Sequence, residues 1–282
     1  MGEFLLDLQQ QTFLQYAVLT GLLASIACGI IGSYVVTRRI TYIAGAIAHS
    51  VLAGMGAARY CQVVCHWDWL HPLYGAIISA LIAAVIIGMV SLSGRQREDT
   101  IIGAVWAIGM AIGILFIFKT PGYNEDLMSY LFGNILMVSS DDLWLIAGLD
   151  AIVVVVGLLF YKQFLAVCFD EEFARLRGIR VEFYYILLLC LTAITVVLLV
   201  TVVGIVMVIA LLTLPVAVAG VFSKRLWHMM VLSTLFTILF TTAGLALSYG
   251  PNLPAGAVTI VLAGAVYLVV IVGSRVFRTR RL

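Results

Sequence analysis

Charged side chains are scarce in this sequence. Asp, Glu, Lys and Arg make up 11% of its 282 residues, whereas a soluble domain carries about a quarter. Hydrophobic residues make up 63%, and the mean hydropathy is +1.15. This apolar content exceeds what one buried core can use, so lipid must be the solvent for much of the chain. The net charge of +2 and the lack of any long block of like charge argue against a nucleic-acid partner.

Catalytic and nucleotide-binding signatures are also missing. The sequence has no G-x-x-x-x-G-K-[ST] phosphate loop, no G-x-S-x-G elbow and no H-E-x-x-H helix. It offers no paired nucleophile and base, which argues against an intramembrane hydrolase. We therefore expect a chain that is not an enzyme, and any ATP hydrolysis that serves it must be carried by a separate chain.

Long apolar runs fill most of the sequence. They are about 18–24 residues long and do not alternate, which is typical of transmembrane helices. The prediction is an all-α polytopic membrane protein, a helical bundle of eight or nine transmembrane helices in a single domain over residues 1–282. The nine candidate spans are 13–36, 40–60, 73–93, 101–118, 142–161, 183–202, 204–222, 226–248 and 255–274. The sixth and seventh have almost no polar connection and Pro215 interrupts the seventh, so one of the nine is a candidate re-entrant or broken helix.

The positive charges predict the orientation of these spans. With nine spans, one side of the membrane carries fourteen Lys and Arg residues and the other carries two, Arg59 and Lys119. The fourteen are Arg38, Arg39, Arg95, Arg97, Lys162, Arg175, Arg177, Arg180, Lys224, Arg225, Arg275, Arg278, Arg280 and Arg281. The positive-inside rule therefore places the N-terminus outside and the C-terminus in the cytoplasm.

The cytoplasmic connection 162–182 is long enough to have structure of its own. Phe169, Phe173 and Leu176 recur at helical spacing, and Gly178 is a natural stop. Acidic residues at the start and arginines at the end suit the helix dipole. The residues that carry this pattern are Asp170, Glu171, Glu172, Phe173, Arg175 and Gly178. We predict one short amphipathic helix, which is either an ordinary interfacial helix or a docking element for a soluble partner.

The outer connection 119–142 contains the apolar stretch Leu127 to Val138. This stretch is too short to span a bilayer. We expect it to lie in the interface or to dip into the outer mouth of the bundle.

Two ionisable residues fall in the middle of predicted spans, where such groups are costly and are functional candidates. His49 lies ten residues after Arg39. At about 1.5 Å per residue it is therefore about 15 Å deep. Asp150 lies at a comparable depth in the fifth span. The two could form a buried pair, a metal site or a proton site. The alternatives are a histidine bonded to a backbone carbonyl and an aspartate capped by a neighbouring threonine.

The outer loop after the second span is rich in residues of metal-ligand type, namely Cys61, Cys65, His66, Asp68 and His71. Thiolate and imidazole ligands suit zinc or copper, so an external metal-collecting role is one reading. The spacing matches no standard zinc site, and Cys61 and Cys65 could instead form a disulfide. We interpret His228, beside Trp227, as an interfacial anchor.

Several segments, in the same order along the chain, resemble the zinc/manganese/iron ABC importer permeases. They are 38–54 (RRITYIAGAIAHSVLAG), 126–134 (DLMSYLFGN), 169–178 (FDEEFARLRG), 203–215 (VGIVMVIALLTLP) and 253–262 (LPAGAVTIVL). The resemblance covers nearly the whole chain and implies a permease in a prokaryotic cell membrane. It implies a homodimer or paired permease, an extracytoplasmic metal-binding protein and a cytoplasmic ATP-binding subunit. The transported ion would be Zn²⁺, Mn²⁺ or Fe²⁺, with no permanently bound cofactor.

The resemblance also assigns roles to residues. His49 falls on the family's intramembrane histidine, a metal ligand on the pathway, and Asp170 to Gly178 falls on its ATPase-coupling helix. Many members carry Asp where this chain has Gly45 and Asn252. Loss of a hard oxygen ligand weakens the case for manganese and leaves zinc slightly ahead, with Asp150 as a hypothetical replacement. The alternative function is an ion-coupled secondary metal carrier, in which His49 and Asp150 would be the coupling groups.

Overall fold

The computed structural model describes residues 7, 10–94, 97–121, 139–205, 208–251 and 253–279. Their regular structure is entirely α-helical, as expected from the apolar runs. The helices are α2 (Thr12–Arg38), α3 (Thr41–Val64), α4 (Pro72–Ser93), α5 (Glu98–Lys119), α7 (Ser140–Leu159), α8 (Tyr161–Phe169), α9 (Glu171–Leu176), α10 (Val181–Val203), α11 (Val208–Phe222), α12 (Leu226–Tyr249) and α13 (Ala255–Thr279).

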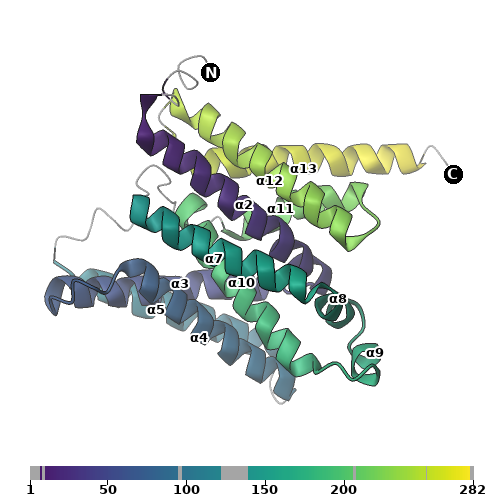
Figure 1. The fold of residues 1–282 in the computed structure, drawn as a ribbon, viewed down its shortest axis with the longest axis horizontal. Coiled ribbons are helices and arrows are strands. Elements are labelled where there is room, and N and C mark those ends of the chain that lie inside the picture. Colours follow the sequence, from purple (N-terminus) through teal and green to yellow (C-terminus); the bar gives the residue numbers. More distant parts are fainter. Residues whose placement is uncertain are drawn as a thin grey trace.

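Eight of these helices are long and apolar enough to cross a membrane. Each has at least 20 residues, or about 30 Å at 1.5 Å per residue, which matches the hydrocarbon core of a bilayer. The ninth apolar helix, α11, is shorter. The prediction of eight or nine membrane helices is therefore confirmed. In Figure 1, α2 and α7 begin on the left of the bundle, and α8, α9 and the C-terminal end of the chain lie on the right. We call the left end, which carries the start of α7, the predicted outer end.

The predicted interruption falls between α10 and α11. Gly204 follows α10 with φ +80°, a conformation that side chains disfavour, and α11 has only 15 residues. Pro215 lies inside α11, and because proline has no N–H it leaves the carbonyl of Leu211 without its usual helical donor. The thiol of Cys28 in α2 donates to that carbonyl at 3.3 Å. A side chain of another helix therefore satisfies the group that proline freed.

The helices pack in two groups that share α10. One group centres on α3, which packs against α4 and α5, and the other on α2, which packs against α12 and α7, while α10 contacts both α4 and α2. Small residues allow close approach, as in other membrane bundles. A Cβ on Gly54 of α3 would lie 2.0 Å from the backbone oxygen of Gly75 in α4. Hydroxyl pairs join α2 to α12, with Ser25 and Thr241 3.4 Å apart and Ser33 and Ser233 3.2 Å apart.

Candidate functional site

His49 lies in the first half of α3 and is buried, with 9% of its surface exposed. Its ring stacks on the indole of Trp106 in α5, with ring centroids 4.3 Å apart and planes at 15°. Its Nδ1 atom is buried and has no hydrogen-bond partner among the residues that the structure describes. The alternative of a histidine satisfied at Nδ1 by a backbone carbonyl is therefore not what the structure shows. A buried imidazole nitrogen without a partner is free to bind a metal ion.

Glycines near this imidazole allow α5 and α11 to pack closely against α3. Gly45 lies one helical turn before His49, and a Cβ there would be 2.6 Å from Cδ1 of Ile209 in α11 and 3.5 Å from Trp106. Gly109 of α5 lies so close to α3 that a Cβ would be 2.7 Å from Cα of Ser50. Side chains from α5 and α11 therefore fill the position next to His49 where a second ligand of α3 would otherwise project.

Asp150 lies in the middle of α7 and is buried, with 5% of its surface exposed. Its Oδ1 accepts a hydrogen bond from the backbone N–H of Ala27 in α2 at 3.2 Å. His49 therefore contacts α5, through Trp106, whereas Asp150 contacts α2, through Ala27. Among the residues that the structure describes, no interaction joins the two side chains. Their pairing stays a hypothesis.

The ligand-type residues lie in the last turn of α3, in the loop that follows it and at the start of α4. Cys61 and Cys65 are both free thiols, so the structure contains no disulfide between them. His66 has φ +56° and is exposed. In the described part of the chain, no three His, Cys, Asp or Glu side chains are grouped so that they could hold a metal ion.

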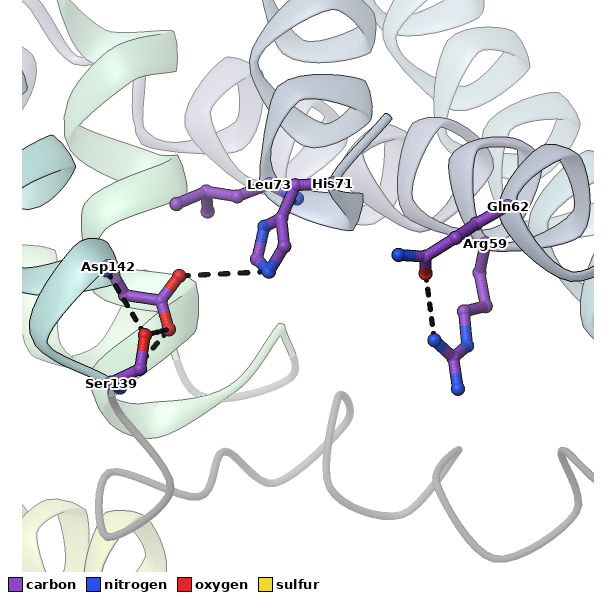
Figure 2. Close-up of polar contacts among 6 residues, drawn as sticks. All are labelled: Arg59, Gln62, His71, Leu73, Ser139 and Asp142. Carbon is purple, nitrogen blue, oxygen red and sulfur yellow. Dashed lines mark hydrogen bonds and ion pairs between the residues drawn. The ribbon is translucent and has the colours of Figure 1, made fainter. Parts of the chain in front are cut away.

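One residue of this loop, His71, contacts another element at the predicted outer end. Its Nδ1 accepts the N–H of Leu73 at 3.4 Å and so caps α4, while its Nε2 lies 3.8 Å from Oδ1 of Asp142 in α7 (Figure 2). The other carboxylate oxygen of Asp142 accepts from the N–H and hydroxyl of Ser139, which completes a capping box at the start of α7. Sequence reasoning missed Asp142 because its partner lies 71 positions earlier in the chain.

The expected helix of the cytoplasmic connection is two helices, and this corrects the sequence prediction. Phe169 ends α8, Asp170 is extended with φ −154°, and α9 begins at Glu171. The Asp170 side chain accepts the N–H of Phe173 at 2.9 Å, which caps α9 and interrupts the helical pattern.

The end of α9 agrees with the sequence. Gly178 has φ +75°, its N–H donates to the carbonyl of Arg175 at 2.9 Å, and the N–H of Ile179 donates to that of Ala174 at 3.0 Å. This is the Schellman arrangement that a glycine stop predicts.

The segment formed by α8 and α9 exposes apolar side chains on its surface, and ion pairs join it to neighbouring helices. Phe169, Phe173 and Leu176 are exposed, and Leu176 retains 88% of its accessible surface. Glu171 forms an ion pair with Arg38 at the end of α2, and Arg38 lies 5.4 Å from the ring centroid of Tyr185 in α10. Arg175 pairs with Glu182 at 2.9 Å. Ion pairs therefore hold this segment to α2 and α10, and its apolar side chains remain exposed.

Three predicted features remain to be placed. The outer stretch Leu127 to Val138 and the turn residue Asn252 lie outside the described residues. His228 is exposed in the first turn of α12 beside Trp227, with ring centroids 3.8 Å apart. This position is compatible with an interfacial anchor, which stays a prediction.

Comparison with known proteins identifies the family. The pattern of the ABC 3 transport family matches residues 10–274. A probable metal transport system membrane protein of Chlamydia trachomatis is 42% identical, over 86% of this chain and 83% of that protein. The manganese transport system membrane protein MntC of Listeria monocytogenes is 35% identical, over 94% of this chain and 92% of that protein. The solved structure of PsaBC from Streptococcus pneumoniae with a Fab superposes with a TM-score of 0.85, at 31% identity over 95% of this chain and 94% of that one.

The match along nearly the whole chain agrees with the all-helical membrane fold and with the lack of any phosphate loop in the sequence. The chain therefore belongs to the ABC 3 transport family, as a membrane-spanning permease subunit of a transporter whose ATPase is a separate subunit.

Proposed function

We propose that this permease carries a divalent transition-metal ion into the cell and that His49 is a ligand on the path. The observation that carries the proposal is the buried Nδ1 of His49, which has no hydrogen-bond partner in the described part of the chain. A polar atom that is buried in a membrane bundle without a partner is costly unless it is used. The names of relatives, metal transport system and manganese transport system membrane proteins, support the same class of cargo.

Two metals compete as the cargo. The site chemistry favours zinc, because residue 45, one turn before His49, is a glycine and supplies no carboxylate, and imidazole suits zinc better than manganese. The names of MntC from Listeria monocytogenes and of the manganese import permease ScaB from Streptococcus parasanguinis favour manganese instead. We take zinc as the first candidate and manganese as the second.

Reconstitution of the permease with its ATPase subunit in liposomes tests the function. We expect ATP-dependent uptake of Zn²⁺, with Mn²⁺ and Fe²⁺ as competitors ranked by their transport rates. Faster uptake of Mn²⁺ than of Zn²⁺ would reverse the order of the two metals. Uptake driven by a proton or sodium gradient without ATP would instead support a secondary carrier, with His49 and Asp150 as its coupling groups.

We also propose the orientation and the partners. With α11 as a ninth crossing, fourteen Lys and Arg residues lie on one side, which supports an N-terminus outside and a C-terminus in the cytoplasm. The predicted outer end would then receive metal from an extracytoplasmic metal-binding protein. The permease would act as a homodimer with two ATPase subunits. Labelling of single cysteines in sealed vesicles tests the orientation, and the mass of the purified complex tests the homodimer.

Asp150 gives a test of whether metal passes between α2 and α7. If its carboxylate contributes charge to the path, Asp150→Asn should lower uptake about 10-fold or more, because a neutral amide attracts a cation less. The fold should survive, since the amide oxygen can still accept the N–H of Ala27. Unchanged uptake at limiting metal would show that Asp150 serves only to join the two helices.

The exposed side of α9 fits a docking role for the ATPase. Leu176→Glu should uncouple ATP hydrolysis from transport, because a charge would enter an apolar contact. We expect weaker co-purification of the ATPase and metal uptake reduced about 10-fold or more. Leu253→Glu, at an exposed leucine before α13, is the control and should retain both. Equal effects of the two substitutions would argue against docking at α9.

A further inference from the structure

A series of side-chain contacts crosses the end of the bundle opposite the predicted outer end. We call its five members, one from each of α9, α2, α10, α4 and α5, the cytoplasmic network: Glu171, Arg38, Tyr185, Ser91 and Glu98. In Figure 1, α9 lies on the right, on the same side as the ends of α2 and α4. The network therefore joins α9 to helices of both packing groups.

Arg38 is the first junction of the network. Its guanidinium forms an ion pair with Glu171, and its Cζ lies 5.4 Å from the ring centroid of Tyr185, where a cation is attracted to the aromatic face. The side chains of Arg38 and Glu171 retain 23% and 33% of their accessible surface, so water and salt screen this pair only in part. A displacement of α9 therefore acts on Tyr185 through Arg38.

Two hydroxyl groups continue the network in a fixed direction. Ser91 donates its hydroxyl proton to the carboxylate of Glu98. A hydroxyl has one proton, so in the contact between Ser91 and Tyr185, whose oxygens are 3.3 Å apart, the tyrosine is the donor. Tyr185 is buried, and loss of the serine hydroxyl would leave its O–H in a place that water does not readily reach.

The helices on either side of this contact are closely packed. Gly88 of α4 lies about one turn before Ser91. A Cβ at Gly88 would be 3.1 Å from Cδ1 of Leu189 and 3.2 Å from Cγ1 of Ile186, both in α10. Close-packed interiors transmit displacement, because they contain few voids into which side chains could move. A shift of Tyr185 therefore moves the end of α4.

The far end of the network leads to the candidate metal ligand. Glu98 lies in the first turn of α5, and Trp106 lies eight residues further along the same helix, or about 12 Å at 1.5 Å per residue. Trp106 stacks on His49 with ring centroids 4.3 Å apart. A helix is a rigid element over two turns, so a shift at Glu98 also displaces Trp106 against His49.

We propose that Arg38, Tyr185 and Ser91 are positioning residues that couple α9 to the metal site through α5. The proposal rests on the proposed function, in which α9 docks on the ATPase and His49 is a ligand. It adds the route by which ATP binding changes the surroundings of that ligand. The three residues act through the indole of Trp106, without contact with the ion.

The fluorescence of Trp106 tests this route with no transition metal present. The permease is combined with its ATPase subunit in lipid nanodiscs, and the same complex with Trp106→Phe gives the background. We expect a non-hydrolysable ATP analogue to shift the emission of Trp106, because α5 moves. Absence of a shift would overturn the proposal. The other four tryptophans of the permease are replaced by phenylalanine, namely Trp67, Trp69, Trp144 and Trp227.

Three variants break the route at successive points. Arg38→Gln removes the ion pair, Tyr185→Phe removes the hydroxyl but keeps the ring, and Ser91→Ala removes the middle contact. Couplings between distant sites are commonly about 5–150-fold. Each variant should therefore reduce the emission shift, and the metal transported per ATP hydrolysed, by about 5-fold or more. The double variant of Tyr185 and Ser91 should lose no more than either single one, because both interrupt one route.

Each variant has a control one or two positions away in the same helix. Arg39→Gln removes a neighbouring charge, and Tyr184→Phe removes a neighbouring hydroxyl. Ser93→Ala removes a hydroxyl that bonds to the carbonyl of Val90 in its own helix. The controls should keep the emission shift and the transport ratio. Equal losses in variants and controls would overturn the route, as would an unchanged shift in both Tyr185→Phe and Ser91→Ala.

Failure of the proposed function has a different signature. A normal Trp106 shift in a complex that takes up no metal with ATP would overturn the proposed cargo and leave the route intact. Normal ATP-driven uptake in all three variants, with an unchanged Trp106 shift, would overturn the route and leave the function intact.

Discussion

His49→Phe should abolish ATP-driven metal uptake while the complex with the ATPase remains intact. Phenylalanine keeps an aromatic ring against Trp106, so the stacked packing in α3 and α5 is preserved, but it removes both nitrogens. Substitution of groups that merely orient a ligand costs about 10–100-fold in metal affinity or activity. Loss of the ligand itself should therefore exceed about 100-fold. Uptake of radioactive Zn²⁺ into liposomes, with ATP hydrolysis measured in parallel, gives the result.

Two variants separate loss of the ligand from loss of packing. His228→Ala removes an exposed histidine at the start of α12 and should retain uptake. Trp106→Leu removes the ring beneath His49 and should raise the KM for metal more than it lowers kcat, because the imidazole is still present but less well oriented. Normal uptake by His49→Phe would exclude His49 as a ligand and would move the path elsewhere in the bundle.

Gly54→Leu should have the largest effect on stability. The added Cβ would lie 2.0 Å from the backbone oxygen of Gly75 and 2.4 Å from Oγ of Ser79, so α3 and α4 would have to separate. Overpacking commonly costs about 1–3 kcal/mol, and a clash with backbone belongs at or above the upper end. A loss of about 3 kcal/mol lowers the unfolding temperature by about 10 °C in a chain of this size.

Gly148 provides the matched control for this prediction. It lies in the exposed face of α7, and a Cβ there would meet nothing within 4 Å. Gly148→Leu should leave the unfolding temperature in detergent nearly unchanged, whereas Gly54→Ala should already lower it. Equal melting temperatures for Gly54→Ala and the unmodified chain would show that α3 and α4 do not approach as closely as described.

The helical membrane fold was predictable because it follows from local properties of the sequence. Apolar length located the spans, and the missing polar connection located the interruption before α11, whereas α11 continues through Pro215. The cytoplasmic segment was predicted less well. The helical spacing of Phe169 and Phe173 led to the prediction of one helix that contains both. Asp170 between them is a good N-cap residue, however, and is followed by two acidic residues. Greater weight on capping would have separated α8 from α9.

The contacts of the candidate site could not be predicted in the same way. Counting residues placed His49 and Asp150 at mid-membrane depth, but no local pattern says that Trp106 lies against one and Ala27 against the other. Such pairings depend on which helices are neighbours. His71 and Asp142 illustrate the same limit, because only the fold brings Nε2 of His71 within 3.8 Å of Oδ1 of Asp142.

The caps of α9 have a consequence for how this region can vary during evolution. Asp170 caps the start of the helix, Gly178 follows its end, and Glu171 pairs with Arg38. Insertion of one residue into α9 would turn everything beyond it by about 100° and would shift the apolar side chains away from the surface at which we propose that the ATPase docks. Surface connections usually tolerate such changes in length. Here we expect exchange of one side chain for another among related permeases, with the number of residues between Asp170 and Gly178 held constant.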